Sequence, residues 1–212
     1  SQLGGGSPMI RGFATNRVLI VVDGVRMNNA IYRSGNLQNI ISLDALAIDD
    51  AEIIFGPGSL IYGSDAIGGV MDFHTLQPKF ATPKNNLVSG NALLRYSSAN
   101  KENTAHFNFN IASSKLSFLT SFTYSNFSDL QMGKNGGDKS YLRNEYVERT
   151  NNADVVVTND NPRVQKFSGY FQKNLLSKLA YQPNKNLLLQ YGFHYSTTGN
   201  TPRYDRLIEY AG

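Results

Sequence analysis

Apolar and polar residues alternate strictly along residues 104–112. The apolar positions fall on every second residue, and they are Ala105, Phe107, Phe109 and Ile111. A period of two residues predicts a β-strand with one apolar and one polar face. The same alternation, weaker over the first of these ranges, predicts four more strands, over residues 87–97, 116–125, 167–182 and 187–196.

The connections between these strands differ in length. Residues 113–115 and 183–186 are short links, and the second is a turn sequence because proline fixes φ and asparagine tolerates a left-handed backbone. Residues 127–165 form a long polar link, which is unusual in a compact domain unless it is functional. Short turns at one end and long loops at the other are typical of an outer-membrane β-barrel with a wet lumen. A soluble β-sandwich with one wet face shows the same alternation, so both interpretations stay open here.

Residues 1–80 have a different, α/β pattern that is rich in glycine. A run of β-branched and aliphatic residues predicts a buried strand over residues 17–22, which an Asp-Gly pair ends. Further strands are expected over residues 51–55 and 70–75. Short helical segments are expected at residues 45–49, after a Ser-Leu-Asp cap, and at residues 59–62.

The composition of the chain also changes near residue 80. Of the 212 residues, the first 80 hold 5 Lys/Arg and 7 Asp/Glu, whereas the remainder hold 15 and 9. Of the 24 Phe and Tyr residues, 18 follow residue 80. Pro78 and Pro83 mark the boundary. The basic residues are scattered singly, which argues against a nucleic-acid partner.

Several classes of protein are excluded by what the sequence lacks. The absence of cysteine excludes a disulfide scaffold, a thiolate metal site and a cysteine nucleophile. No apolar run approaches 18 residues, so no transmembrane helix is expected. No signal peptide begins the chain, so we expect either a cytoplasmic protein or a chain that starts after its natural beginning.

No constellation of catalytic residues is found in the sequence. Gly58 and Gly63 have the spacing of a phosphate-binding loop, but Ser64 and Asp65 stand where lysine and then serine or threonine are required, and an aspartate repels phosphate. The three histidines lack the spacing of metal ligands. We therefore expect no enzyme and no cofactor or metal. A nucleotide-dependent enzyme that uses residues 56–65 is the alternative, and ATP binding would support it.

Four segments of the first part together resemble the plug domain of TonB-dependent outer-membrane receptors. They are Ile-Arg-Gly-Phe at 10–13, Val-Leu-Ile-Val-Val-Asp-Gly at 18–24, Ala-Ile-Asp-Asp-Ala-Glu-Ile-Ile at 47–54, and the glycine-rich run at 56–70. The resemblance covers roughly residues 8–76. The chain departs from the family's pattern at Phe55, at Asp49 and Asp50, and at residues 72–75, where Asp-Phe-His-Thr replaces an Asn-Ile-Ile-Thr type of ending.

The resemblance implies the fold class, an α+β plug domain followed by antiparallel transmembrane β-barrel strands. These strands would be part of an incomplete barrel of about 22 strands. Two domains are implied: residues 1–80 as a plug domain whose N-terminal part is missing, and residues 81–212 as the first five or so barrel strands. Residues 127–165 would then form an extracellular loop.

The resemblance also implies localisation in the cell outer membrane and uptake of a scarce nutrient, without covalent chemistry. The partners would be outer-membrane lipid, and TonB with its inner-membrane motor complex, acting through a segment that precedes Ser1. Haem or a ferric siderophore is the expected ligand, because residues 23–29 and 202–207 look most like the haem/haemoglobin-type branch. Cobalamin and oligosaccharides share the remaining possibilities. The alternative is a soluble β-rich ligand-binding or adhesion module.

Ligand contacts are then expected at the apex of the plug. The loop at 26–36 offers side chains that can meet carboxylates, propionates or catecholates, and they are Arg26, Asn28, Asn29, Tyr32 and Arg33. Alternatively, these side chains hydrogen-bond the polar barrel wall. Further candidates are His106 and His194 on the lumen face, and Arg203 and Arg206 in the next outer loop, where a salt-bridge cluster is the competing interpretation. His74 is expected to be structural.

Overall fold

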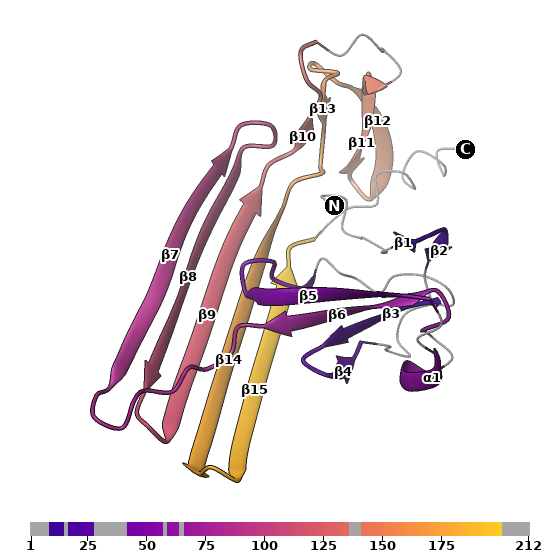
Figure 1. Ribbon diagram of the computed structural model, residues 1–212. Helices are drawn as coiled ribbons and strands as arrows, with labels where there is room; N and C mark the ends of the chain where they lie inside the picture. The colour runs from indigo at the N-terminus through magenta and orange to yellow at the C-terminus, as the bar shows by residue number, and fades with distance from the viewer. Residues whose placement is uncertain are drawn as a thin grey trace.

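The two largest β-sheets of the chain meet where one end of the smaller sheet's strands reaches the larger sheet (Figure 1). The computed structural model describes residues 9–14, 17–27, 42–56, 59–63, 66–135 and 141–200. We call the four-stranded sheet of the first part the small sheet, and the sheet of five long strands the large sheet. Within the described ranges, no helix has the length and apolar character needed to cross a membrane.

The large sheet is antiparallel throughout, in the order β15-β14-β9-β8-β7. Its strands are β7 (Leu87–Ser97), β8 (Glu102–Ala112), β9 (Leu116–Phe127), β14 (Tyr170–Asn184) and β15 (Leu187–Thr198). The pairing of β14 with β9 runs from Tyr170 opposite Phe127 to Tyr181 opposite Leu116. All five strands that the alternation predicts are therefore confirmed.

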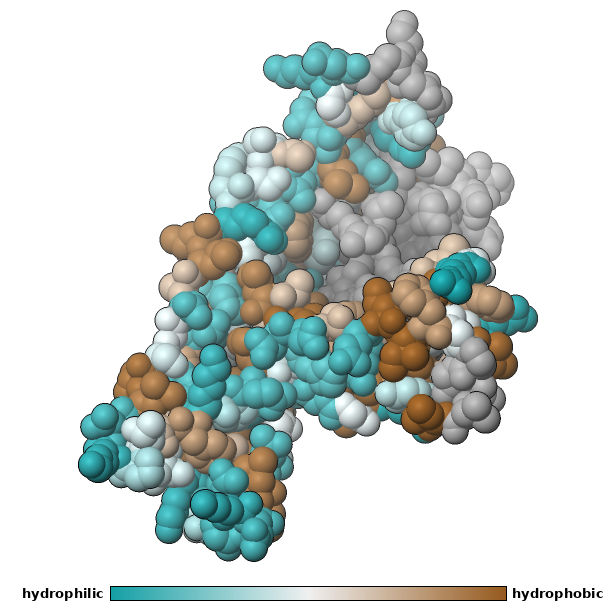
Figure 2. All heavy atoms as spheres, viewed as in Figure 1, coloured by the Kyte–Doolittle hydropathy of each residue, from teal (hydrophilic) through white to brown (hydrophobic). Residues whose placement is uncertain are grey.

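The two faces of the large sheet differ in polarity. Most of the buried side chains are polar, and they include Thr104, His106, Ser121, Asn174 and Lys178, although Leu119 and Leu176 are buried among them. The alternate side chains are large, apolar and exposed, and they include Phe107, Ile111, Phe118, Leu179 and Tyr181. A soluble β-sandwich buries its apolar face, so this arrangement is its inverse and is typical of the wall of a membrane β-barrel. Hydrophilic residues also gather at the lower ends of the strands, around their short turns (Figure 2).

The small sheet lies against the polar face of the large sheet (Figure 1). It has the order β4-β3-β6-β5, and its strands are β3 (Val18–Val22), β4 (Val25–Arg26), β5 (Ile48–Phe55) and β6 (Gly69–Thr75). β3 and β6 are parallel, whereas the other pairs are antiparallel. Leu19, Val21, Ala66 and Val70 form the buried core of this part, with Ile54 and Tyr62 packed against it. The predicted strands are confirmed, and β3 is buried along its whole length.

Two smaller elements complete the first part. β1 (Met9–Ile10) and β2 (Phe13–Ala14) form a hairpin, and α1 (Ser59–Tyr62) is the helical turn that the sequence predicts. Glycine is required at the start of β6 because Gly69 has a φ of 140° and a Cβ there would lie 2.7 Å from the carbonyl oxygen of Ile54.

The helix predicted at residues 45–49 is wrong. A turn occupies this position: the Leu46 amide donates to Asp44 Oδ1 at 3.0 Å, and the Ala47 amide donates to the Asp44 carbonyl at 2.9 Å. β5 begins at Ile48, where pairing with β6 starts. Tertiary pairing therefore overrides a weak local preference for helix.

The long polar link is also more structured than the sequence suggests. It contains two antiparallel pairs: β10 (Leu130–Gln131) with β13 (Val164–Gln165), and β11 (Glu145–Thr150) with β12 (Ala153–Thr158). The second pair is a hairpin closed by Asn151 and Asn152, whose φ values are 52° and 68°. Two positive φ values match the right-handed twist of a tight hairpin. The link extends beyond the upper ends of the long strands (Figure 1).

Candidate functional site

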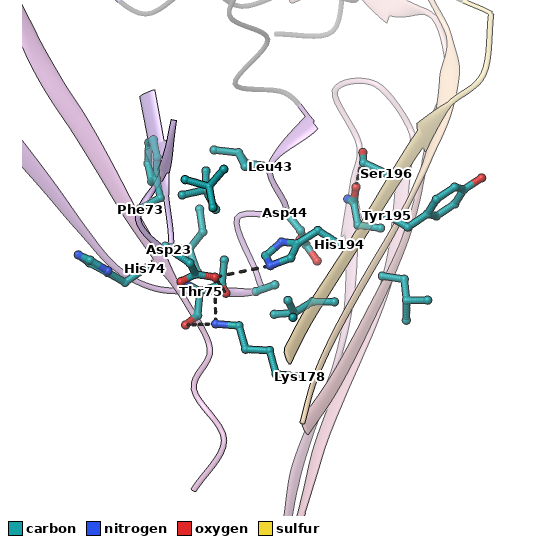
Figure 3. Close-up of a pocket in the computed structure, with 18 of the residues that line it drawn as sticks. Asp23, Leu43, Asp44, Phe73, His74, Thr75, Lys178, His194, Tyr195 and Ser196 are labelled. Carbon is teal, nitrogen blue, oxygen red and sulfur yellow. Dashed lines mark hydrogen bonds and ion pairs between the residues drawn. The ribbon is translucent and has the colours of Figure 1, made fainter. Parts of the chain in front are cut away.

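A cavity of about 850 Å³ lies where the small sheet meets β14 and β15 (Figure 3). Its walls come from the β3–β4 turn, the turn that precedes β5, the end of β6 and the polar face of the large sheet. The charged and polar side chains that line it include Asp23, Asp44, Thr75, Lys178, His194 and Ser196. Residues distant in the sequence therefore converge on one space between the two sheets, where charged side chains lie among apolar ones such as Leu43, Phe73 and Leu176.

Asp23 is the centre of the contacts in this cavity. The two-residue turn of Asp23 and Gly24, with φ values of 48° and 79°, joins β3 to β4 and projects the Asp23 carboxylate toward the large sheet. Lys178 Nζ lies 2.9 Å and His194 Nε2 lies 3.5 Å from Asp23 Oδ2. Thr75 donates from Oγ1 at 2.6 Å and from its amide at 3.0 Å.

The electrostatics of this contact favour a charged aspartate. Burial alone would raise the pKa of Asp23, but hydrogen bonds from His194, Thr75 and Lys178 outweigh it and hold the pKa well below its usual range. Lys178 is only 7% exposed, so its ammonium depends on Asp23 for compensation. The ion pair therefore ties the small sheet to β14.

A second contact joins the sheets through Asp44. Thr123 Oγ1 donates to Asp44 Oδ2 at 2.5 Å and lies 2.7 Å from His106 Nδ1, while Asn108 Nδ2 lies 3.1 Å from His106 Nε2. Since the threonine proton goes to Asp44, its oxygen accepts the Nδ1 proton of His106, and Nε2 accepts from Asn108. Both ring nitrogens of His106 are thus occupied within the protein.

A third contact fixes the segment that connects the two sheets. Asn110 Nδ2 donates to the Lys79 carbonyl at 2.9 Å and its Oδ1 accepts from the Lys79 amide at 3.0 Å. Ser117 Oγ donates to the same carbonyl at 3.0 Å. The main chain at Lys79 is therefore fastened to β8 and β9 just before the large sheet begins.

The sequence-predicted site residues fall into three groups. His106 and His194 lie on the polar face of the large sheet, and Arg26 is an exposed residue at the end of β4. His74 points away from Asp23, Lys178 and His194 (Figure 3). The remaining candidates lie outside the described residues, and they are Asn28, Asn29, Tyr32, Arg33, Arg203 and Arg206. Ligand binding by any of them stays a prediction.

Sequence reasoning missed Asp23, Asp44 and Lys178 as contact residues. Asp23 was recognised only as the end of a strand, and Asp44 only as part of a helix cap. A signal existed for Lys178, because it is a lysine on the polar face of a strand whose other polar positions are mostly uncharged. Such an isolated charge facing inward requires a partner.

Comparisons with known proteins agree with this architecture. The family model described as TonB-dependent Receptor Plug Domain matches residues 1–70. A vitamin B12 transporter BtuB of Vibrio vulnificus (strain CMCP6) is 47% identical over 79 residues, which are 35% of this chain and 12% of the relative. A heme/hemopexin utilization protein C of Haemophilus influenzae (strain 86-028NP) is 43% identical over 68 residues, 32% of this chain and 9% of the relative. The chain thus spans only a small part of these relatives.

Solved structures show the same fold over most of the chain. The copper transporter OprC has a TM-score of 0.66 at 15% identity, and the match covers 92% of this chain and 26% of that one. The FrpB iron transporter from Neisseria meningitidis has a TM-score of 0.58 at 16% identity, covering 90% of this chain and 26% of that one. At these identities the likeness concerns the fold alone.

The inverted polarity of the large sheet and these matches define the fold as strands of a β-barrel wall with a smaller domain packed against their polar face. The first third of the chain, residues 1–70, matches the plug domain of TonB-dependent receptors. Most of the small sheet falls within the matched plug segment, and the large sheet has the fold of barrel-wall strands. The matched relatives are transporters and receptors rather than enzymes. A barrel of 22 strands and a domain boundary at residue 80 stay predictions.

Proposed function

We propose that the full receptor takes up haem or a ferric siderophore across the outer membrane, driven by TonB. The observation that carries this proposal is the docking of a matched plug domain against the polar face of barrel-type strands. The similarity of the plug segment to a haem utilization protein supports haem, and its similarity to a vitamin B12 transporter makes cobalamin the competing ligand.

The contacts between the sheets suit a plug that must shift during uptake. Three sets of polar contacts hold it to the wall, centred on Asp23, Asp44 and Lys79. Water can replace polar partners, whereas the buried apolar core around Leu19 and Val70 would be costly to expose. A pull on the plug would therefore detach it from the wall before its own core opens.

A growth assay tests the ligand and the energy source together. The complete receptor is expressed in a host that lacks its own receptors for haem, ferric siderophores and cobalamin, with and without TonB. We expect growth on haem or a ferric siderophore only when TonB is present. Growth on cobalamin alone would replace the ligand, and ligand-dependent growth without TonB would refute the coupling.

Electrophoresis with and without boiling tests the competing class, a soluble binding module. A closed barrel in detergent resists unfolding, so the unboiled receptor should migrate differently from the boiled one. From a barrel of about 22 strands with their connections, we expect a complete receptor of about 70–90 kDa in outer-membrane fractions. A water-soluble band of 23.4 kDa that boiling does not shift would refute the receptor.

A further inference from the structure

A group of carboxylates with one imidazole lies on the β5–β6 pair of the small sheet, apart from the contacts of Asp23. Asp50 and Glu52 stand two residues apart on β5, and His74 lies opposite Asp50 on β6. One potential ligand atom from each of the three lies within 4.8 Å of the other two. Figure 2 shows hydrophilic residues over this part of the small sheet.

An irregularity in the strand pairing accompanies this arrangement. Ile48 pairs with Thr75 and Asp50 pairs with His74, so Asp49 is an extra residue without a partner in the ladder. Such a bulge re-aims the side chains beside it. Asp50, Glu52 and His74 consequently share one face of the sheet, while Asp49 stands outside the pairing.

A buried carboxylate continues the group on the same face. Asp72 pairs with Glu52 and stands two residues before His74, so its side chain projects to the same side. Asp72 is only 9% exposed, and within the described part of the chain its buried Oδ1 has no hydrogen-bond partner. An unpaired buried carboxylate oxygen is costly unless a cation or a donor reaches it.

No cation from the protein compensates these charges within the described ranges. The ion pairs found there involve Glu102, Asp154 and Asp23, and none of them includes Asp50, Glu52 or Asp72. Three carboxylates therefore share one sheet face with a single imidazole. This excess of negative charge favours a bound cation.

We propose that Asp50, Glu52 and His74 bind a divalent transition-metal ion, with Asp72 as the neighbouring buried carboxylate. Two carboxylate oxygens and one imidazole nitrogen form a mixed ligand set that suits a first-row ion such as Zn²⁺. Ligands of a tetrahedral Zn²⁺ stand about 3.4 Å apart, so rotation of the exposed Asp50 and Glu52 side chains closes the site. The proposal does not depend on which nutrient the receptor carries.

Calorimetric titration of the complete, chelator-treated receptor in detergent with Zn²⁺ tests the site. The variants are Glu52→Gln and His74→Gln, and the matched control is Asp49→Asn, an exposed carboxylate on the same strand outside the ladder. We expect one Zn²⁺ to bind wild type and Asp49→Asn with equal affinity, and both variants to bind it at least about tenfold more weakly. Equal affinity in all four proteins, or no binding to wild type, overturns the proposal.

Copper provides an independent readout that does not depend on comparing affinities. Electron paramagnetic resonance of wild type with one equivalent of Cu²⁺ should show nitrogen coupling from one imidazole. The His74→Gln variant should lose that coupling, whereas Asp49→Asn should retain it. Identical spectra in wild type and His74→Gln would remove His74 from the site and refute the proposed ligand set.

Discussion

Replacing Asp23 by asparagine should release the plug from the barrel wall without changing its shape. An asparagine keeps the volume of the side chain, and its Oδ1 can still accept from the Thr75 amide. It cannot compensate the Lys178 ammonium, which is 7% exposed and 2.9 Å from the carboxylate. The variant therefore leaves a nearly buried positive charge without its partner.

The size of the effect follows from this burial. Breaking a buried ion pair by removing one partner costs about 3–5 kcal/mol. The Asp23 side chain is 21% exposed, so water can reach the vacated position and we expect a smaller cost of about 2–3 kcal/mol. At 1.4 kcal/mol for each factor of ten, the opening of this contact should become about 30- to 140-fold more frequent.

Hydrogen exchange detected by mass spectrometry measures this opening in the complete receptor. Peptides that cover residues 18–27 and 70–77 contain the Asp23 amide, which donates to the Phe73 carbonyl at 2.9 Å, and the Thr75 amide. Exchange in these peptides should accelerate by the predicted factor in Asp23→Asn. Peptides from β8 and β9 should be unaffected, because their ladder does not include the plug.

Asp154→Asn is the matched control. Asp154 pairs with Arg149 at 3.5 Å on an exposed hairpin, where an ion pair contributes only about 0–1 kcal/mol. The double variant Asp23→Asn with Lys178→Gln should recover part of the loss, since no uncompensated charge remains. Exchange within threefold of wild type in Asp23→Asn would refute the assignment of this ion pair as a plug tether.

Three further predictions concern the same interface and the plug core. The pKa of Asp23 is lower in the folded protein, so its contribution to stability is complete above the ordinary pKa of about 4 and declines as the pH falls below it. The difference in melting temperature between wild type and Asp23→Asn should therefore be constant above pH 5 and shrink below pH 4. Thr123→Val leaves Asp44 and His106 without their shared hydrogen-bond partner and should destabilise docking of the two sheets by about 1.5–3 kcal/mol. Thermal unfolding in detergent measures this loss, and an unchanged unfolding midpoint would exclude a role for these hydrogen bonds. Gly69→Ala places a methyl group against the Ile54 carbonyl at a φ of 140° and should lower the stability of the plug by at least about 2 kcal/mol. Hydrogen exchange of the β6 amides measures this loss, and exchange at the wild-type rate would contradict the prediction.

The long strands were predictable because the alternation of apolar and polar residues that they require is visible in the local sequence. A strand with lipid on one side and water on the other must alternate at every residue, so the pattern over residues 87–97 gives β7 with the same bounds as the structure. The hairpin of β11 and β12 carried a comparable signal, since Asn151 and Asn152 form its turn. The polar composition of residues 127–165, which is typical of a loop, masks this signal.

The contacts between the sheets could not be predicted in the same way. Asp23 and Lys178 are 155 residues apart, and only the docking of the two sheets brings them together. The group formed with His74 depends on the bulge at Asp49, which shifts the register by one residue. Sequence spacing therefore indicates no metal site, although strand pairing brings two carboxylates and one imidazole together on one face.

The parallel pairing of β3 with β6 determines how the plug would respond to mechanical force. Under the proposed coupling, TonB pulls on the chain before β3, while the Lys79 contacts hold the chain that follows β6. Because the strands are parallel, tension then acts in opposite directions along them, and the five residue pairs from Val18–Gly69 to Val22–Phe73 carry the load together in shear. A ladder loaded in shear yields as a unit, whereas an unzipped ladder yields one pair at a time. The ladder would therefore outlast the polar contacts at Lys79, and the plug would leave the wall with its core intact.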